Sequence, residues 1–154
     1  MDKTQFKIFC DKYFRIIGFE KYKNLYYLNG DAHILCALKL QKSNYSNTYY
    51  VNYYYFLGDF NDSTKFPTIY DSDIDGRISV MSKNMLHKGE HFMTAQIEYE
   101  EYSEEELEQY FDIAFNDVIL PPISQGKKYI LNHLKEKYFL TLNQEEVLKK
   151  LRSK

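Results

Sequence analysis

The sequence contains no tryptophan, only two cysteines and no stretch that approaches 18 consecutive apolar residues. The lack of a long apolar run argues against a membrane-spanning helix, and the charged N-terminus lacks the uninterrupted apolar region of a signal peptide. Cys10, in an expected helix, and Cys36, in an expected strand, are interpreted as small buried hydrophobic residues rather than as a disulfide pair. This cysteine usage indicates a reducing compartment, and we expect a cytoplasmic protein.

An excess of one charge is also missing. The 22 acidic and 20 basic residues leave a net charge of -2, which argues against nucleic acid as the partner, because dedicated nucleic-acid-binding proteins usually have a strongly basic balance. The length of 154 residues predicts one α+β domain, residues 1–154, that buries a sizeable core unaided. No internal repeat or low-complexity linker divides the chain.

Tyrosine, in contrast, is abundant, with 16 residues, and it is concentrated in residues 48–57. β-Branched and aromatic residues bounded by polar turn residues are typical of a central strand. One face of this strand, which we expect to be buried, carries Tyr49, Val51, Tyr53, Tyr55 and Leu57. The other face carries Tyr50, Asn52, Tyr54 and Phe56. Because asparagine and tyrosine hydroxyl groups need hydrogen-bonding partners, we expect this second face to be half wet or covered by something polar.

The elements before this strand are predicted from local signals. Apolar spacing over residues 4–17 predicts a helix that ends where Gly18 adopts a left-handed conformation. Asn29-Gly30 is a strong hairpin signal. It predicts a tight turn between two antiparallel strands, residues 21–28 and 32–40.

After the aromatic strand, Asp75-Gly76 is interpreted as a turn that enters a strand at residues 77–81. Alternation predicts a further strand at residues 92–99, with a connection at Lys88-Gly89 between the two. The capping-box pattern that begins at Ser103 predicts the start of a helix, and Pro121-Pro122 are expected to end it. Two further helices are predicted, over residues 124–135 and after Asn143.

This order of elements predicts an α+β fold: a meandering antiparallel sheet of about five strands, with the N-terminal helix and two or three C-terminal helices packed on one face. The opposite face can stay open, as antiparallel sheets allow. We therefore treat that face as the candidate surface for a partner or ligand. Its candidate binding residues are Tyr50, Tyr54, His33, Lys39, Asn52 and Lys42.

Two patterns match metal sites incompletely. Residues 71–79 match the first nine positions of an EF-hand loop, but Ser82 stands where a bidentate glutamate should complete the coordination. The candidate Ca²⁺ ligands are Asp71, Asp73 and Asp75. Residues 87–91 match H-x-x-E-H, but the central glycine disfavours the helix that such a zinc site needs. We therefore expect no cofactor and no metal.

A run of carboxylates surrounds the start of the late helix. Such a run could complement a basic partner, and it equally fits a solvated helix end stabilised by the helix dipole. The residues are Glu98, Glu100, Glu101, Glu104, Glu105, Glu106, Glu108 and Asp112.

Several of these features occur together in a known order. They are the helix followed by Gly18-Phe19, a hairpin strand, Leu40-Gln41-Lys42-Ser43, the aromatic strand and the late acidic-capped helix. In this order the chain resembles the bacterial domain-of-unknown-function family 4304 over roughly residues 6–133. The resemblance implies an intracellular bacterial α+β protein without an assigned activity, and it supplies no catalytic residues.

Three classes of function remain open. The leading hypothesis is a non-enzymatic protein-binding module, including an immunity-type inhibitor of a basic toxin domain, which needs only aromatic anchors and complementary charge. The alternative is a small-ligand-binding domain with a pocket between the open sheet face and the C-terminal segment, and a pocket lined by Tyr50, Tyr54 and His33 would favour it. The third is an enzyme of unrecognised type, which would require perturbed ionisable groups that converge in a cleft.

Overall fold

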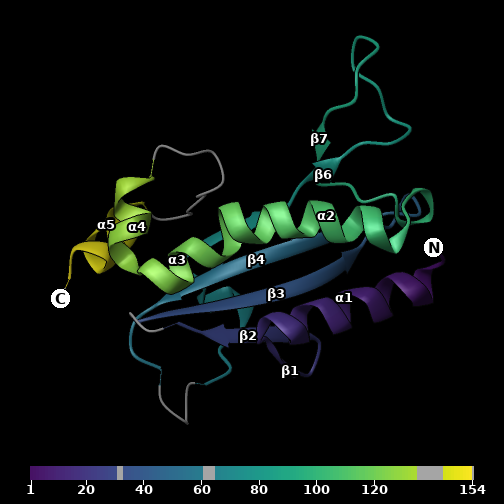
Figure 1. The fold of residues 1–154 in the computed structure, drawn as a ribbon. Coiled ribbons are helices and arrows are strands. Elements are labelled where there is room, and N and C mark those ends of the chain that lie inside the picture. The colour runs from purple at the N-terminus through teal and green to yellow at the C-terminus, as the bar shows by residue number, and fades with distance from the viewer. Residues whose placement is uncertain (31–32, 61–64, 135–143, 154) are drawn as a thin grey trace.

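A five-stranded antiparallel sheet organises the computed structural model, which describes residues 1–30, 33–60, 65–134 and 144–153 (Figure 1). Each strand pairs with the next one in the chain, in the order β1-β2-β3-β4-β5. The strands are β1 (Glu20–Tyr22), β2 (Leu25–Asn29), β3 (Ile34–Lys42), β4 (Tyr49–Leu57) and β5 (Ile74–Arg77). This meander, with its N-terminal helix and C-terminal helices, confirms the predicted α+β class.

The helices lie on one face of the sheet (Figure 1). They are α1 (Lys3–Ile17), α2 (Glu104–Ala114), α3 (Leu120–Gln125), α4 (Lys127–Asn132) and α5 (Gln144–Arg152), with a π-helical turn, η3 (Phe115–Ile119), between α2 and α3. Short 3₁₀ turns are η1 (Ile69–Asp71) and η2 (Tyr99–Glu101), and β6 (Val80–Met81) pairs with β7 (Met93–Thr94). Within the described parts of the chain, none of the helices has the length and apolar character needed to cross a membrane.

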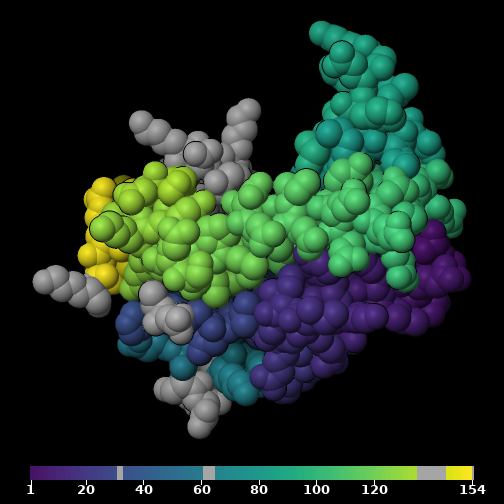
Figure 2. All heavy atoms as spheres, viewed as in Figure 1, coloured from purple at the N-terminus to yellow at the C-terminus, as the bar shows by residue number. Residues whose placement is uncertain are grey.

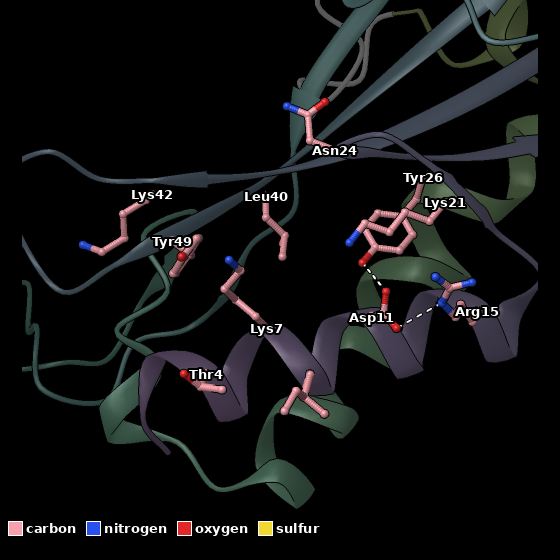
Figure 3. Close-up of a pocket in the computed structure, with 11 residues that line it drawn as sticks. Thr4, Lys7, Asp11, Arg15, Lys21, Asn24, Tyr26, Leu40, Lys42 and Tyr49 are labelled. Atoms are coloured by element: carbon pink, nitrogen blue, oxygen red, sulfur yellow. Dashed lines mark hydrogen bonds and ion pairs between the residues drawn. The ribbon is translucent and has the colours of Figure 1, made fainter.

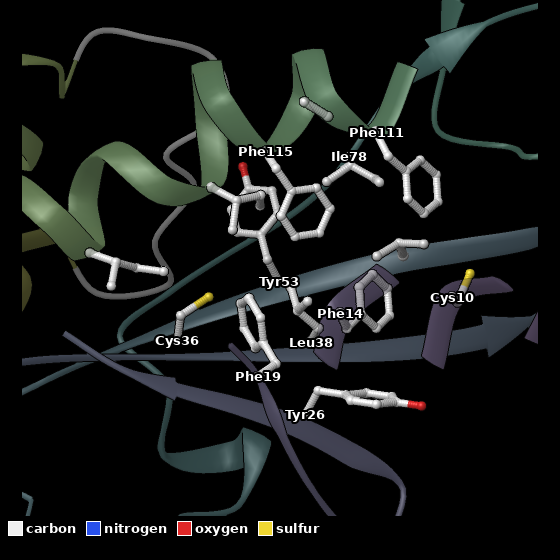
Figure 4. Close-up of a cluster of buried hydrophobic side chains, with 14 of the residues drawn as sticks. Cys10, Phe14, Phe19, Tyr26, Cys36, Leu38, Tyr53, Ile78, Phe111 and Phe115 are labelled. Atoms are coloured by element: carbon white, nitrogen blue, oxygen red, sulfur yellow. The ribbon is translucent and has the colours of Figure 1, made fainter. Parts of the chain in front are cut away.

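The core lies between the sheet and the helices. As alternation predicts, all five residues of the expected inner face of β4 are buried, with Tyr53 and Tyr55 fully so. Rings from α1 and α2 meet above them (Figure 4): Phe14 stacks on Phe111 with ring centroids 6.4 Å apart. Cys36 points into this core from β3, and Cys10 joins it from α1. Both are free thiols, as the sequence predicts.

The predicted end of α1 is confirmed. Gly18 has φ 123°, and the Phe19 N–H donates to the Phe14 carbonyl over 3.0 Å while the Gly18 N–H donates to the Arg15 carbonyl over 3.1 Å. These bonds satisfy carbonyls that a helix end otherwise leaves unpaired.

The predicted first hairpin is only partly correct. The expected strand over residues 21–28 is divided into β1 and β2, because Lys23 takes a left-handed conformation with φ 56° and turns the chain. Neither Asn29 nor Gly30 has a positive φ, so the predicted tight turn does not form at these two residues. Gly30 is instead required by close packing, because a Cβ there would lie 2.6 Å from the Ile123 carbonyl oxygen.

The later strands also differ from the prediction. Gly76 lies inside β5 opposite Tyr53 rather than in a turn before a strand, and a Cβ on it would come within 2.3 Å of the Tyr53 hydroxyl. The predicted strand over residues 92–99 shortens to β7 plus a single bridge between Ile97 and Tyr49. The five-strand count is therefore reached by a different set of strands.

The two prolines do not end the helix that begins at α2. Pro121 and Pro122 sit in the first turn of α3, after η3. Proline has no N–H, so the Val118 carbonyl, four residues before Pro122, loses its helical donor. The Tyr55 hydroxyl from β4 lies 3.2 Å from that oxygen and 2.9 Å from the Ile119 oxygen.

Farther along the chain, the predicted helix over residues 124–135 starts later than expected, because Gly126 with φ 83° separates α3 from α4. The predicted cap Asn143 lies outside the described residues. The terminal helix itself is confirmed as α5, with Val147 and Leu151 buried.

Candidate functional site

The outer face of the sheet, which the sequence predicts to be open, is covered at one end. A second apolar cluster there consists of Leu25, Tyr27, Leu35, Ala37 and Phe56, packed against Tyr54, Phe60, Phe66 and Ile69. The Tyr27 hydroxyl donates to the Pro67 carbonyl over 2.8 Å, and Phe66 stacks on Tyr22 at 4.2 Å between centroids. The predicted open face therefore includes a small second core under the segment that follows β4.

The other end of the outer face carries a polar network. Arg77 donates from Nε to the Asn52 amide oxygen over 3.0 Å and from Nη2 to the Gln41 amide oxygen over 3.3 Å. Asn52 in turn donates to Gln41 over 2.8 Å. The guanidinium also lies 4.0 Å above the centre of the Tyr50 ring, a cation–π distance. Asn52, the polar residue in an aromatic strand, is thus buried with its amide satisfied inside the protein.

The structure brings only some of the predicted binding residues together. Tyr50, Asn52, Tyr54 and Lys39 share the outer face, and burial raises the pKa of the Tyr54 hydroxyl. Lys39 lines a cavity of about 280 Å³ under residues 66–70, which is at the lower limit for a small-molecule site. Tyr50, Asn52 and Tyr54 do not line this cavity.

The two remaining predicted residues lie elsewhere. His33 stands at the far end of β3, with φ 60°, where it pairs with Asp59. Lys42 projects to the helix side of the sheet and donates to the Ser43 and Ser46 carbonyls over 3.1 and 2.6 Å. The predicted pocket containing Tyr50, Tyr54 and His33 is therefore not assembled.

The three aspartates of the EF-hand-like stretch do not converge either. Asp73 accepts from the Leu57 N–H over 2.8 Å and from Lys150 over 2.6 Å, whereas Asp71 accepts from a threonine hydroxyl. Asp75 lies within extended strand β5 rather than in a chelating turn. Over the described parts of the chain, no group of three or more His, Cys, Asp or Glu side chains is placed to hold a metal ion.

Five carboxylates of the expected acidic run are exposed around the start of α2. We call this set the acidic edge, and it consists of Glu100, Glu101, Glu104, Glu105 and Glu108. Its helix begins as predicted: the Ser103 hydroxyl accepts from the Glu106 N–H and the Glu106 carboxylate accepts from the Ser103 N–H, each over 3.2 Å. Glu106 also pairs with Lys83, and this bond lowers the pKa of Glu106. None of the five edge carboxylates forms an ion pair in the described structure.

A hairpin projects from the body beside this edge, and we call residues 80–94 the hairpin arm (Figures 1 and 2). Its tip is the predicted connection, where Lys88 and Gly89 have φ 51° and 79° and His87 and Glu90 exchange backbone hydrogen bonds of 2.9 and 3.0 Å. The two histidines of the zinc-like pattern thus flank a turn instead of lying on a helix.

Internal hydrogen bonds hold the arm together, and two contacts attach it to residues around the start of α2. The Ser82 hydroxyl donates to the Met85 carbonyl over 2.7 Å and accepts from the Phe92 N–H over 3.0 Å. At its base, the Tyr102 hydroxyl donates to the Met81 carbonyl over 2.6 Å, and Lys83 pairs with Glu106. Sequence reasoning located the turn but missed the projection, because the two short strands that carry it have no long alternating pattern.

Comparison with curated proteins and with solved structures gives no match. A family model matches residues 10–125 and is described as a domain of unknown function, DUF4304. The matched region runs from α1 through the sheet and the hairpin arm to the end of α3. It therefore includes the outer sheet face, the acidic edge and the hairpin arm. By this match the chain belongs to the DUF4304 family.

Proposed function

We propose that this chain is a non-enzymatic protein-binding module that docks its acidic edge and hairpin arm onto a basic surface of another protein. The observation that carries the proposal is the set of exposed carboxylates of the acidic edge, which form no ion pair within the described residues. Charge of one sign on a docking surface speeds encounter with an oppositely charged partner and disfavours others. Neutralising a basic toxin domain by covering its surface is one role that this chemistry suits.

Stability of α2 alone does not account for these carboxylates. Acids in the first turn interact favourably with the helix dipole, which covers Glu104 and Glu105. Glu101 precedes the helix and Glu108 follows its first turn. Glu104 and Glu108 are also four residues apart, where like charges destabilise a helix by roughly 0.2–0.5 kcal/mol. Because α2 contains no lysine or arginine, a basic partner is the natural source of compensation.

The hairpin arm would supply the apolar part of the interface. Leu86 and Met93 are 56% and 53% exposed, and methionine is enriched at protein interfaces relative to the rest of the surface. The bonds made by Ser82 and the tight turn at the tip link the two sides of the arm. A preformed arm pays less conformational entropy on binding than a flexible loop would.

The experiment compares three tagged proteins in extracts of the source cell, with mass spectrometry of what each retains. The test variant is Glu105→Gln/Glu108→Gln. The matched control, Asp117→Asn/Glu145→Gln, removes two exposed carboxylates outside the acidic edge. We expect the parent and the control to retain the same protein and the test variant to lose it.

Binding of the purified pair then provides the quantitative measurement. The acidic-edge variant should bind at least about tenfold more weakly, a loss near 1.4 kcal/mol, and added salt should weaken the parent complex. Leu86→Ser/Met93→Ser should raise the dissociation rate. A retained protein that binds the parent and both charge variants equally, or recovery of a small molecule in its place, would contradict the proposal.

A further inference from the structure

A groove runs along α1 on the helix side of the sheet (Figure 3). It has a volume of about 710 Å³ and is lined by residues of α1, β1, β2, β3 and β4 and of the turn between β1 and β2. Its floor is formed by Tyr26, Leu40 and Tyr49, and lysines stand around it. The volume is within the range of pockets that hold small molecules, roughly 300–1,000 Å³.

The charged groups around the groove are mostly cationic. Lys7 comes from α1, Lys21 from β1 and Lys42 from β3, so three separate elements each bring an ammonium group to the same groove. None of the three forms an ion pair with a carboxylate in the described parts of the chain. Lys42 is oriented by two backbone carbonyls, which hold the ammonium group without cancelling its charge.

The one carboxylate in the groove is already occupied. Asp11 accepts from the Tyr26 hydroxyl over 2.6 Å and from the Arg15 Nε over 3.0 Å. These two bonds, the tyrosine hydroxyl first, lower the pKa of Asp11, so the carboxylate stays ionised and compensates Arg15. Over the described residues, Lys7, Lys21 and Lys42 therefore have no carboxylate in an ion pair with them, in a protein whose net charge is -2.

We propose that this groove binds a small polyanion that carries phosphate groups. Lysine ammonium groups bind phosphate as point charges, and a concave site concentrates their field on a bound anion. Lys21 and Lys42 lie 5.6 and 6.0 Å from the centres of the Tyr26 and Tyr49 rings. The rings thus border the cationic region and give it a surface that is poorly hydrated on one side.

The burial of the floor favours a small anion over a nucleic-acid strand. Proteins that bind single strands stack successive bases on exposed aromatic rings. Here Tyr26 and Tyr49 are each only 4% exposed, so their faces are not accessible to bases. The site offers charge within one bounded groove, which fits a compact ligand with several phosphates.

The test uses inorganic triphosphate as the probe and isothermal titration calorimetry on the full chain. The parent should bind one equivalent, and each of Lys7→Gln, Lys21→Gln and Lys42→Gln should weaken binding by roughly twofold to fivefold. The triple variant should then weaken it by at least about tenfold. A matched control, Lys12→Gln/Lys128→Gln/Lys149→Gln, removes three exposed charges outside the groove and should bind within about twofold of the parent.

A further variant tests whether a negative charge in the groove opposes binding of the anion. Asp11→Asn removes the only carboxylate in the groove and releases Arg15, so it should bind triphosphate more tightly than the parent. Melting curves check that each variant folds. If the triple variant is unfolded, Lys7→Gln and Lys21→Gln, both at exposed positions, decide the result.

Three outcomes would overturn this assignment. They are no binding at millimolar triphosphate, equal losses in the groove and control variants, and weaker binding by a folded Asp11→Asn. A single-stranded oligonucleotide that binds more tightly than triphosphate and displaces it would also overturn it, because the ligand would then be a strand. The acidic edge and the hairpin arm are not involved, so the result is independent of the proposed protein partner.

Discussion

Replacing Gly76 by alanine should destabilise the protein, although alanine is ordinarily the better residue inside a strand. Its φ is not positive, so the backbone tolerates a side chain. In the absence of a clash, alanine would gain about 0.5–1 kcal/mol through the lower entropy of the unfolded chain. Here its Cβ would lie 2.3 Å from the hydroxyl oxygen of Tyr53 and 2.4 Å from the ring carbon that carries it.

The clash is costly because the Tyr53 side chain is enclosed by the core and cannot shift without displacing its neighbours. Tyr53 is fully buried in β4 and packs against Tyr55 with ring centroids 5.6 Å apart. Overpacking in a dense core typically costs 1–3 kcal/mol. After subtracting the entropic gain, we expect Gly76→Ala to lower the free energy of unfolding by about 1–2 kcal/mol.

Urea unfolding of a double-mutant series measures this contact directly. In a Tyr53→Leu background the clashing atoms are absent, so Gly76→Ala should be neutral or stabilising, and the coupling energy should be about 2 kcal/mol. Tyr53→Phe is the matched control: it keeps the ring carbon 2.4 Å from the new methyl group, so most of the penalty should remain. A stabilising Gly76→Ala in the parent would refute the reasoning.

Three other predictions follow from single contacts. Ser103→Ala should cost roughly 0.5–2 kcal/mol in urea unfolding, because it removes an N-cap; a neutral result would mean that the observed cap carries no free energy. Tyr55→Ala should lower the free energy of unfolding by about 3–5 kcal/mol, because Tyr55 is a buried aromatic residue, whereas Tyr50→Ala should change it by no more than about 1 kcal/mol. Equal losses would contradict the assignment of Tyr55 to the buried face of β4 and of Tyr50 to the outer face. Asp11 has a lowered pKa in the folded state, chiefly because Tyr26 donates to it. The ionised Asp11 carboxylate therefore stabilises the folded protein at any pH above the ordinary pKa of aspartate. This stabilisation is lost as the pH falls through the lower pKa that Asp11 has in the folded state. The stability difference between the parent and Asp11→Asn should shrink in acid, and a pH-independent difference would exclude this linkage.

The predictions that succeeded depend on chemistry within a few residues. The alternation of β4, the cap at Gly18 and the capping box at Ser103 are each decided by neighbours along the chain. Their geometry needs no knowledge of the rest of the fold, and sequence reasoning located each of them correctly.

The errors concern residues whose role is set by a distant partner. Gly30 and Gly76 were interpreted as turn residues, but each is small because Ile123 or Tyr53 approaches it. Local sequence does not distinguish a glycine that turns the chain from one that admits a neighbour. Pro121 was likewise expected to end a helix, but it lies in the first turn of α3, and the Val118 carbonyl, which Pro122 leaves without a helical donor, is contacted by the hydroxyl of Tyr55, 63 residues away in sequence.

Only part of the candidate surface was predicted, because the rest also depends on residues that are distant in the sequence. Alternation placed Tyr50 and Tyr54 on one face, but it could not show that Phe60, Phe66 and Ile69 fold back over the end of that face. These apolar residues are scattered through a loop rich in aspartate, so they form no periodic pattern. The cationic groove was also missed, because its lysines come from elements far apart in the sequence and only the fold brings them together.

The two buried thiols can be used as chemical probes of local opening of the folded protein. Burial raises the pKa of both Cys10 and Cys36, so neither reacts with an alkylating reagent until its surroundings open. Cys10 belongs to α1 and Cys36 to the centre of the sheet. Modification rates measured under native conditions, with peptide mass mapping, would therefore report the opening free energy of α1 and of the sheet separately. Equal rates would indicate that the helix and the sheet open as one cooperative unit, and a faster Cys10 would indicate that α1 detaches first.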